Sequence, residues 1–177
     1  MGSTYIVLKE YPVQTIINLI DDTNKIEIDG MIIPVDKEKM LAFKNSTKCL
    51  TCDIEATHFS LEKIANCTHG LYGNYHFNLY GSRNNNKILL TVDHAILAKN
   101  NGEHHHTNFN TMCVSCNNRR GSKFENIDDF ITFSKLNPIS KHISDTIAYK
   151  KKKELFEKTV QKSHVQLYYK NRNKNLA

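Results

Sequence analysis

Two pairs of cysteines constrain this chain of 177 residues more than any other feature of its sequence. Cys49 and Cys52 form one CxxC pair, and Cys113 and Cys116 form a second. Each pair can direct two thiolates to the same side of a tight turn, and four thiolates are a complete ligand set for a tetrahedral zinc ion. A single pair could also be a redox pair, but two pairs predict one structural Zn²⁺ site.

Further metal-binding candidates lie between the two pairs. Cys113 follows Cys52 by 61 positions, a longer gap than in a compact zinc finger, so an inserted segment must fill it. The fifth cysteine, Cys67, is expected to be a small buried apolar residue and not a ligand. If the two cysteine pairs did not form the site as predicted, a histidine of the same segment would replace a cysteine as a zinc ligand. The candidates are His58, His69 and His76.

A β-hairpin is expected inside this inserted segment. Residues Tyr75–Tyr80 and Lys87–Val92 have the composition of strands, and the cluster Asn84–Asn86 between them favours a turn. The second strand would end at Asp93 and His94. The end of a strand is a suitable place to present catalytic groups.

Three polar motifs follow one another from the end of this hairpin onward. Asp93-His94 stands directly after the strand, Asn108 lies in the following loop, and Asn117 comes directly after the second CxxC pair. This combination resembles the HNH, or ββα-metal, nuclease family, and in particular zinc-bearing phage HNH proteins that include junction-resolving endonucleases. The resemblance implies an α+β fold with a ββα-metal core, a four-cysteine zinc site and endonuclease activity on DNA.

The chemistry of phosphodiester hydrolysis explains why these residue types are useful. The reaction requires an activated water, neutralisation of charge on the phosphate and stabilisation of the leaving oxygen. His94 is the expected general base, because imidazole exchanges protons near neutral pH. Asp93 and Asn117 supply oxygen ligands that suit a catalytic Mg²⁺ or Mn²⁺ ion. The resemblance implies that Asn108 orients the His94 ring.

Basic residues follow these motifs where the helix of the family would begin. Arg119, Arg120 and Lys123 are expected to contact phosphates beside the scissile bond, although solvated helix charges would look the same in the sequence. The run His104–His106 lies in the loop before Cys113. We expect a mobile, solvated loop there and leave these histidines outside the site.

Three regions are expected along the chain, and they are an N-terminal extension over residues 1–48, a zinc-stapled HNH nuclease core over 49–125 and a helical basic region over 126–177. The N-terminal extension contains β-like runs at Tyr5–Leu8 and Ile26–Ile28 and a possible helix over Val13–Ile20. Pro34 would break the pattern. The sequence does not indicate a function for this extension.

The C-terminal region is expected to be helical and positively charged. Asn126 or Asp128 would cap a helix that runs through Lys135, and a second helix is expected over Ser144–Lys162. Residues 141–177 contain ten Lys or Arg against three Asp or Glu, a net charge of +7 within a chain total of +6. Such a tail favours DNA as a partner through backbone contacts, but a solvated helix face carries the same pattern.

These observations predict a DNA endonuclease that uses one catalytic metal ion. The alternatives are a non-catalytic, zinc-dependent nucleic-acid-binding module and a zinc-stabilised protein-interaction or inhibitor domain. The longest apolar runs, such as Ile16–Ile20, fall short of the roughly 20 residues of a membrane span, and the first residues do not resemble a secretory signal. We therefore expect no membrane partner and a cytoplasmic protein, in the host cytoplasm if phage-encoded. A homodimer would be required for concerted cleavage of both strands.

Overall fold

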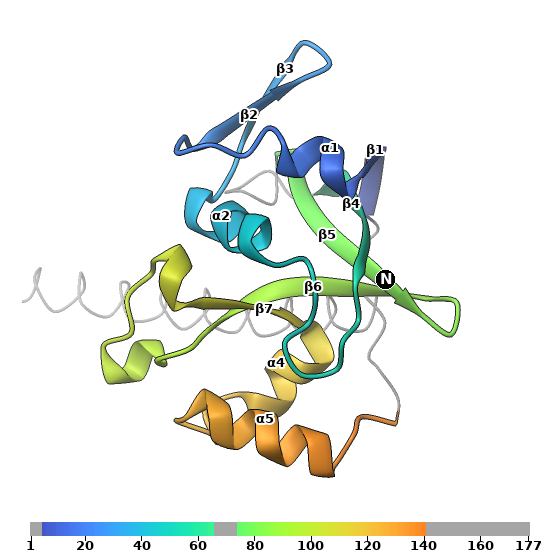
Figure 1. Cartoon of the computed structure of the whole chain (residues 1–177). Helices are drawn as coiled ribbons and strands as arrows, with labels where there is room; N and C mark the ends of the chain where they lie inside the picture. The colour runs from blue at the N-terminus through green and yellow to red at the C-terminus, as the bar shows by residue number, and fades with distance from the viewer. Residues whose placement is uncertain (1–4, 66–73, 141–177) are drawn as a thin grey trace, which may run out of the picture.

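The computed structural model describes residues 5–65 and 74–140, which form an α+β fold (Figure 1). Five strands make one antiparallel sheet in the order β1-β4-β5-β6-β7, and β2 pairs with β3 in a separate hairpin. The elements, in chain order, are β1 (Tyr5–Pro12), α1 (Val13–Ile17), β2 (Lys25–Ile28), β3 (Met31–Pro34), α2 (Lys37–Asn45), β4 (Ala56–Ile64), β5 (His76–Arg83), β6 (Asn86–His94), the 3-10 turns η1 (Ala98–Asn100) and η2 (His106–Asn108), β7 (Phe109–Cys113), α4 (Val114–Arg120) and α5 (Ile127–Leu136).

A row of buried side chains crosses the five-stranded sheet. Tyr11 of β1 lies opposite Phe59 of β4, which lies opposite Leu79 of β5. Leu79 faces Leu90 of β6, and Leu90 faces Cys113 of β7. All five residues are buried, and directly opposed side chains of this kind contribute roughly 0.2–1 kcal/mol per pair. The hydrophobic core thus runs across the sheet and ends on a cysteine of the second CxxC pair.

The hairpin β5–β6 confirms the prediction made from the asparagine cluster. Arg83 pairs with Asn86, so Asn84 and Asn85 form a two-residue turn. Their φ angles of 52° and 59° are left-handed, as a type I′ hairpin turn requires, and asparagine tolerates this conformation better than most residues. The turn fixes the register that brings Asp93 and His94 to the end of β6.

The segment before residue 48 packs against the strands that follow it. β1 is hydrogen-bonded to β4 at the edge of the main sheet, and α2 packs Phe43 against Phe59 with ring centroids 6.1 Å apart. Helix α1 is shorter than the expected Val13–Ile20, because the chain turns after Ile17 and places Ile20 in the core. The expected boundary at residue 48 therefore does not separate two hydrophobic cores in the described residues.

The first C-terminal helix agrees with its prediction. The Asn126 side chain accepts a hydrogen bond of 2.8 Å from the Asp128 amide at the start of α5, and the helix ends at Leu136, two residues before Pro138. The predicted helix Ser144–Lys162 and the basic tail lie outside the described residues, as do Cys67 and His69.

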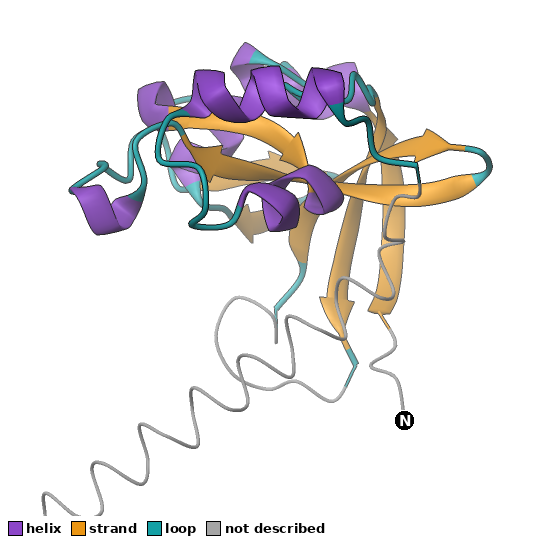
Figure 2. Cartoon of the chain, turned by 90° about the horizontal axis from the view of Figure 1, so that it is seen from below, coloured by secondary structure: helices purple, strands orange, loops and turns teal. Residues whose placement is uncertain are grey.

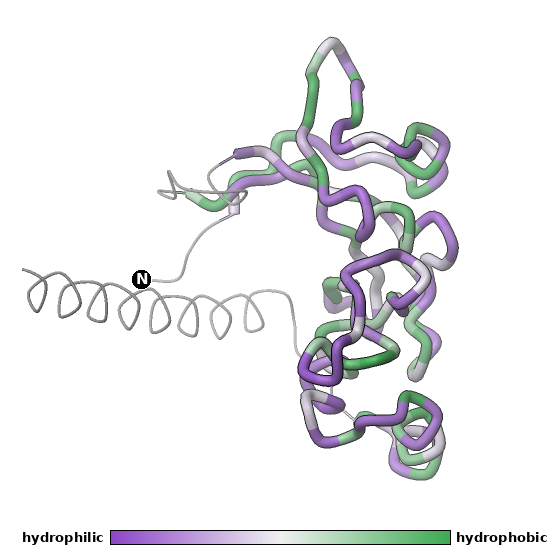
Figure 3. The backbone as a smooth tube through the Cα atoms, turned by 90° about the vertical axis from the view of Figure 1, so that its left-hand side faces the viewer, coloured by the Kyte–Doolittle hydropathy of each residue, from purple (hydrophilic) through white to green (hydrophobic). Residues whose placement is uncertain are grey.

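Most described helices gather at one end of the long strands (Figure 2). Short hydrophobic stretches alternate with hydrophilic ones along the chain (Figure 3). Within residues 5–65 and 74–140, no helix is both long enough and apolar enough to span a membrane.

Candidate functional site

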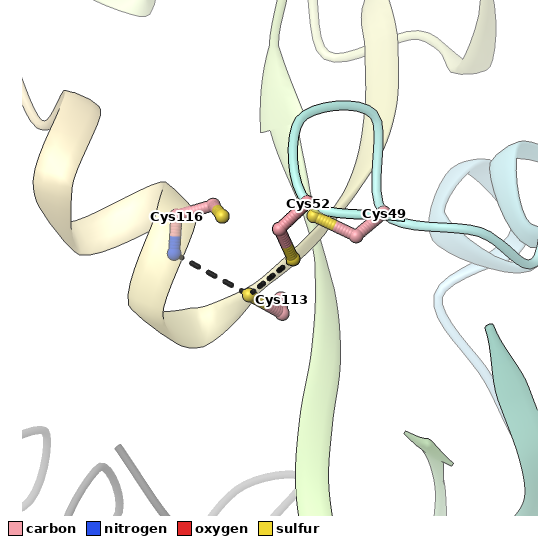
Figure 4. A group of neighbouring side chains, drawn as sticks. All are labelled: Cys49, Cys52, Cys113 and Cys116. Atoms are coloured by element: carbon pink, nitrogen blue, oxygen red, sulfur yellow. Dashed lines mark hydrogen bonds between the residues drawn. The ribbon is translucent and has the colours of Figure 1, made fainter. Parts of the chain in front are cut away.

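The four cysteines of the two CxxC pairs come together at one point of the fold (Figure 4). Their sulfur atoms all lie within 4.8 Å of one another. Cys49 and Cys52 come from the turn that precedes β4, whereas Cys113 ends β7 and Cys116 lies in the first turn of α4. Distant parts of the sequence therefore build one cluster.

The spacing of the sulfur atoms fits a metal centre better than a disulfide. Cys52 Sγ and Cys113 Sγ are 3.6 Å apart, whereas a disulfide bond is about 2.05 Å long. A zinc ion with bonds of about 2.3 Å would place tetrahedral sulfur ligands about 3.8 Å from each other. All four cysteines carry free thiols, and only Cys52 is more than slightly exposed. The residues present can hold a metal ion such as zinc.

Backbone hydrogen bonds shape the first cysteine turn and tie it to the sheet. The Asp53 amide donates to the Cys49 carbonyl over 3.2 Å, and Asp53 itself has a left-handed φ of 58°. The Leu50 amide donates to the carbonyl of Thr111 in β7 over 2.9 Å. The first pair is thus fixed to the strand that carries Cys113.

The second cysteine turn follows directly from the meeting of β7 and α4. Cys113 is the last residue of the strand and the N-cap of the helix, and its Sγ accepts a hydrogen bond of 3.4 Å from the Cys116 amide. An amide that donates to a sulfur in this way stabilises negative charge on the sulfur.

The crowding of four sulfur atoms perturbs their acidity. The Cys113 thiol, followed by that of Cys116, donates to Cys52 and lowers the pKa of Cys52 to about 6. Neighbouring Cys116, Cys49 and Cys52 in turn raise the pKa of Cys113, because they accept its proton and accumulate negative charge around it. A divalent cation would replace these shared protons, as metal binding by thiolates requires.

Asp93 and His94 occupy the end of β6, next to α4. They lie opposite Asn110 and Phe109 of β7, respectively. The His94 ring contacts the Phe109 ring edge to face, with centroids 4.7 Å apart and planes at 87°. Asp93 is buried, whereas His94 is half-buried.

Arg120 has a different position from the one expected. Its side chain is completely buried and forms an ion pair in which Nη1 lies 2.6 Å from Asp93 Oδ2. It also donates to the carbonyl oxygens of His94, Ala95 and Glu125. The expected phosphate contact is therefore corrected, because every described hydrogen bond of this guanidinium is made inside the protein.

The position of Arg120 could have been inferred in part from the sequence. Asn117 and Arg120 are three positions apart, so a helix presents both on one face. Asn117 Nδ2 donates to the carbonyl of Val92 over 3.1 Å, which places that face against the end of β6. Since its nitrogen is bound in this way, the Asn117 amide has its oxygen left as a ligand atom. The Asn117 side chain therefore lies against the end of β6, which carries Asp93 and His94.

Asn108 stabilises the loop after β6 through the backbone. Its Oδ1 accepts from the Ile96 amide over 2.9 Å, and its Nδ2 donates to the carbonyls of Ile96 and Glu103 over 3.1 and 2.9 Å. These three bonds replace the expected contact with the His94 ring. Asn108 therefore positions His94 by closing the loop that follows it, and not by touching the imidazole.

The other two basic residues differ from each other in their surroundings. The guanidinium of Arg119 packs on the Phe133 ring, with Cζ 4.7 Å from the centroid, and donates to the Asn137 carbonyl. It connects α4 to α5. Lys123 follows the helix and is exposed. Of the three residues expected to bind nucleic acid, Lys123 has the most accessible charge.

No family model, curated protein sequence or solved structure matches this chain.

We expect replacement of Arg120 by methionine to lower the free energy of unfolding by about 3–5 kcal/mol, because it leaves the buried Asp93 carboxylate without a partner. Urea denaturation of the zinc-loaded protein measures the change. Arg119→Met is the matched control on the same helix and is expected to cost about 1 kcal/mol or less, since Arg119 is partly exposed. Equal losses for the two variants would contradict the role assigned to Arg120.

Proposed function

We propose that this protein is a metal-dependent DNA endonuclease of the HNH type. The observation that carries the proposal is the bond from Asn117 to the Val92 carbonyl, which sets α4 against the end of β6, where Asp93 and His94 follow Val92. The elements β6, β7 and α4 are two antiparallel strands followed by a helix, the element order that the proposed HNH unit requires. The four-cysteine cluster connects the start of α4 to the turn before β4 and keeps this unit in place.

In this proposal His94 acts as the general base. Its ring is held against Phe109, and the backbone after it is fixed by the bonds from Asn108 to Ile96. An imidazole oriented in this way can accept a proton from a water molecule that attacks a phosphorus atom. The partial exposure of His94 leaves room for a nucleic-acid phosphate beside the ring.

Asp93 and Asn117 provide the oxygen atoms for the catalytic metal in this proposal. Arg120 occupies Asp93 Oδ2 and leaves Oδ1 as a single ligand atom. Asn117 is oriented by its bond to Val92, so its amide oxygen is the second. A Mg²⁺ or Mn²⁺ ion bound there would neutralise charge on the phosphate and the leaving oxygen. Two protein ligands are enough for such an ion, because Mg²⁺ usually keeps several water molecules among its ligands.

Positive charge supplies the affinity for DNA in this proposal. Lys123 lies exposed just after α4, and residues 141–177 have a net charge of +7. Contacts of this kind recognise phosphates without reading the base sequence, so binding should weaken steeply as salt is added.

One observation favours the alternative of a non-catalytic zinc module that binds nucleic acid. The ion pair with Arg120 already neutralises Asp93, and this lowers the attraction of the site for a divalent cation. The alternative retains the cysteines and the basic tail but predicts no cleavage.

Cleavage of supercoiled plasmid tests the proposal directly. We expect the zinc-loaded protein to convert the plasmid to nicked or linear product when Mg²⁺ or Mn²⁺ is added, and to release no product when these ions are omitted and the structural zinc is retained. Branched and single-stranded DNA would be assayed in parallel. Binding of all three DNA forms without cleavage in any metal ion would support the non-catalytic module instead.

A further inference from the structure

The histidine run His104–His106 packs against α2 and forms a defined cluster. The His106 amide and its Nδ1 both lie within hydrogen-bond distance of Glu38 Oε2, at 2.8 and 2.9 Å. His105 Nε2 lies 3.9 Å from the same oxygen. In place of the expected mobile, solvated loop, the run is packed on the first turn of α2, where the Glu38 carboxylate contacts two of the three histidines.

We infer that Glu38, His105 and His106 form a second metal site, separate from the cysteines, that takes a divalent transition ion such as Zn²⁺. One ligand atom from each residue lies within 4.8 Å of the other two. Two imidazoles and one carboxylate are a ligand set that zinc accepts, with a fourth position left for water. The two imidazole ligands select ions of this class over Ca²⁺ or Mg²⁺, which prefer oxygen ligands alone.

The surroundings of each ligand support this assignment. The Glu38 side chain is only 16% exposed, and donation from the His106 amide and ring lowers the pKa of its carboxyl to about 2. Nδ1 of His105 lies 2.8 Å from Thr107 Oγ1, which orients the ring and leaves Nε2 toward Glu38. The Thr107 amide also donates to this Nδ1 over 3.4 Å, so both contacts hold the ring in the same orientation.

A metal ion would take the place of the proton now shared between His106 and Glu38. The bond from Nδ1 to Oε2 would be exchanged for one bond from each atom to the ion, and the proton would leave to solvent. The ion would connect α2 to the loop between β6 and β7. This inference does not depend on nuclease activity, because it concerns binding alone.

Zinc stoichiometry of the full chain tests the inference. The protein is dialysed against a small excess of free Zn²⁺ and its bound zinc is measured by mass spectrometry of the element. We expect two zinc ions per chain for the wild type and one for Glu38→Gln and for His106→Ala. His104→Ala is the matched control and should retain two ions, since His104 lies beside Asp36 and outside the ligand set.

The absorption spectrum of the Co²⁺-substituted protein shows which of the two sites a variant has lost. It therefore distinguishes the loss of the second site from a general failure to fold. Co²⁺ bound by cysteines gives a sulfur charge-transfer band, whereas Co²⁺ bound by nitrogen and oxygen gives only ligand-field bands. The variants should lose the second signal and retain the first. One zinc ion per wild-type chain, or two in every variant with unchanged affinity, would overturn the inference and leave the cluster as a hydrogen-bonded contact only.

Discussion

Replacement of His94 by glutamine is expected to slow DNA cleavage by about 100- to 10,000-fold, the usual contribution of a general base. Glutamine has a similar reach and can form hydrogen bonds, but it cannot take up a proton from water. The ring lies at the end of β6 on a contact with Phe109, so the substitution disturbs little of the core. Single-turnover rates of plasmid nicking, measured at saturating metal and protein, report the change in the chemical step.

His104→Gln is the control for this measurement. His104 also contacts Phe109, with ring centroids 4.9 Å apart, but it lies in the loop after β6 and is exposed. We expect it to cleave at a rate close to that of the wild type. Zinc content and DNA affinity should be equal in all three proteins. A His94 variant that loses less than about tenfold in rate would show that another group accepts the proton, and cleavage unchanged in both variants would indicate a contaminating nuclease.

Loss of the four-cysteine metal is expected to unfold much of the sheet. Structural zinc sites bind with apparent free energies of about 10–16 kcal/mol in zinc-finger peptides, while whole domains are stable by only about 5–15 kcal/mol. Cys113 has three roles, since it ends β7, caps α4 and lies opposite Leu90 in the buried row. We therefore expect Cys113→Ser, or chelation of zinc from the wild type, to abolish cooperative unfolding in urea.

Cys67→Ser controls for the loss of a thiol. Cys67 lies outside the described residues and is not expected to be a ligand, so this variant should keep one structural zinc ion and a cooperative transition. Near-ultraviolet circular dichroism and urea titration would be recorded for each protein with and without chelator. A cooperative transition of unchanged midpoint after complete zinc removal would contradict a structural metal and favour unliganded thiols.

The sequence predicted the hairpin turn and the start of α5 correctly, because both depend on residues that are adjacent in the chain. The turn at Asn84 and Asn85 was predicted because few residues adopt left-handed conformations readily, and the start of α5 because Asn126 is a good cap. The addition of β1 to the edge of the main sheet was not predicted. Pairing between β1 and β4 joins residues about 50 positions apart, and nothing local encodes it.

The candidate site was predicted to a similar extent. The motif around Asp93 and His94 placed both residues correctly at a strand end, because strand and turn signals are local. The burial of Arg120 was not predicted, because a basic residue after a CxxC pair has the same appearance in a sequence whether it faces DNA or a buried carboxylate. The partners of the histidine run were missed for the same reason, since Glu38 lies 68 positions before His106.

The distance along the chain between the two cysteine turns has a consequence for the order of folding. A zinc ion that joins Cys52 to Cys113 closes a ring of chain that contains β4, β5, β6 and β7. Closing a ring of this length costs conformational entropy, which is recovered only when the strands inside it are already paired. During synthesis, moreover, the ion has only two of its four ligands until residue 113 is made. Metal capture is therefore expected to complete the folding of this protein and not to begin it.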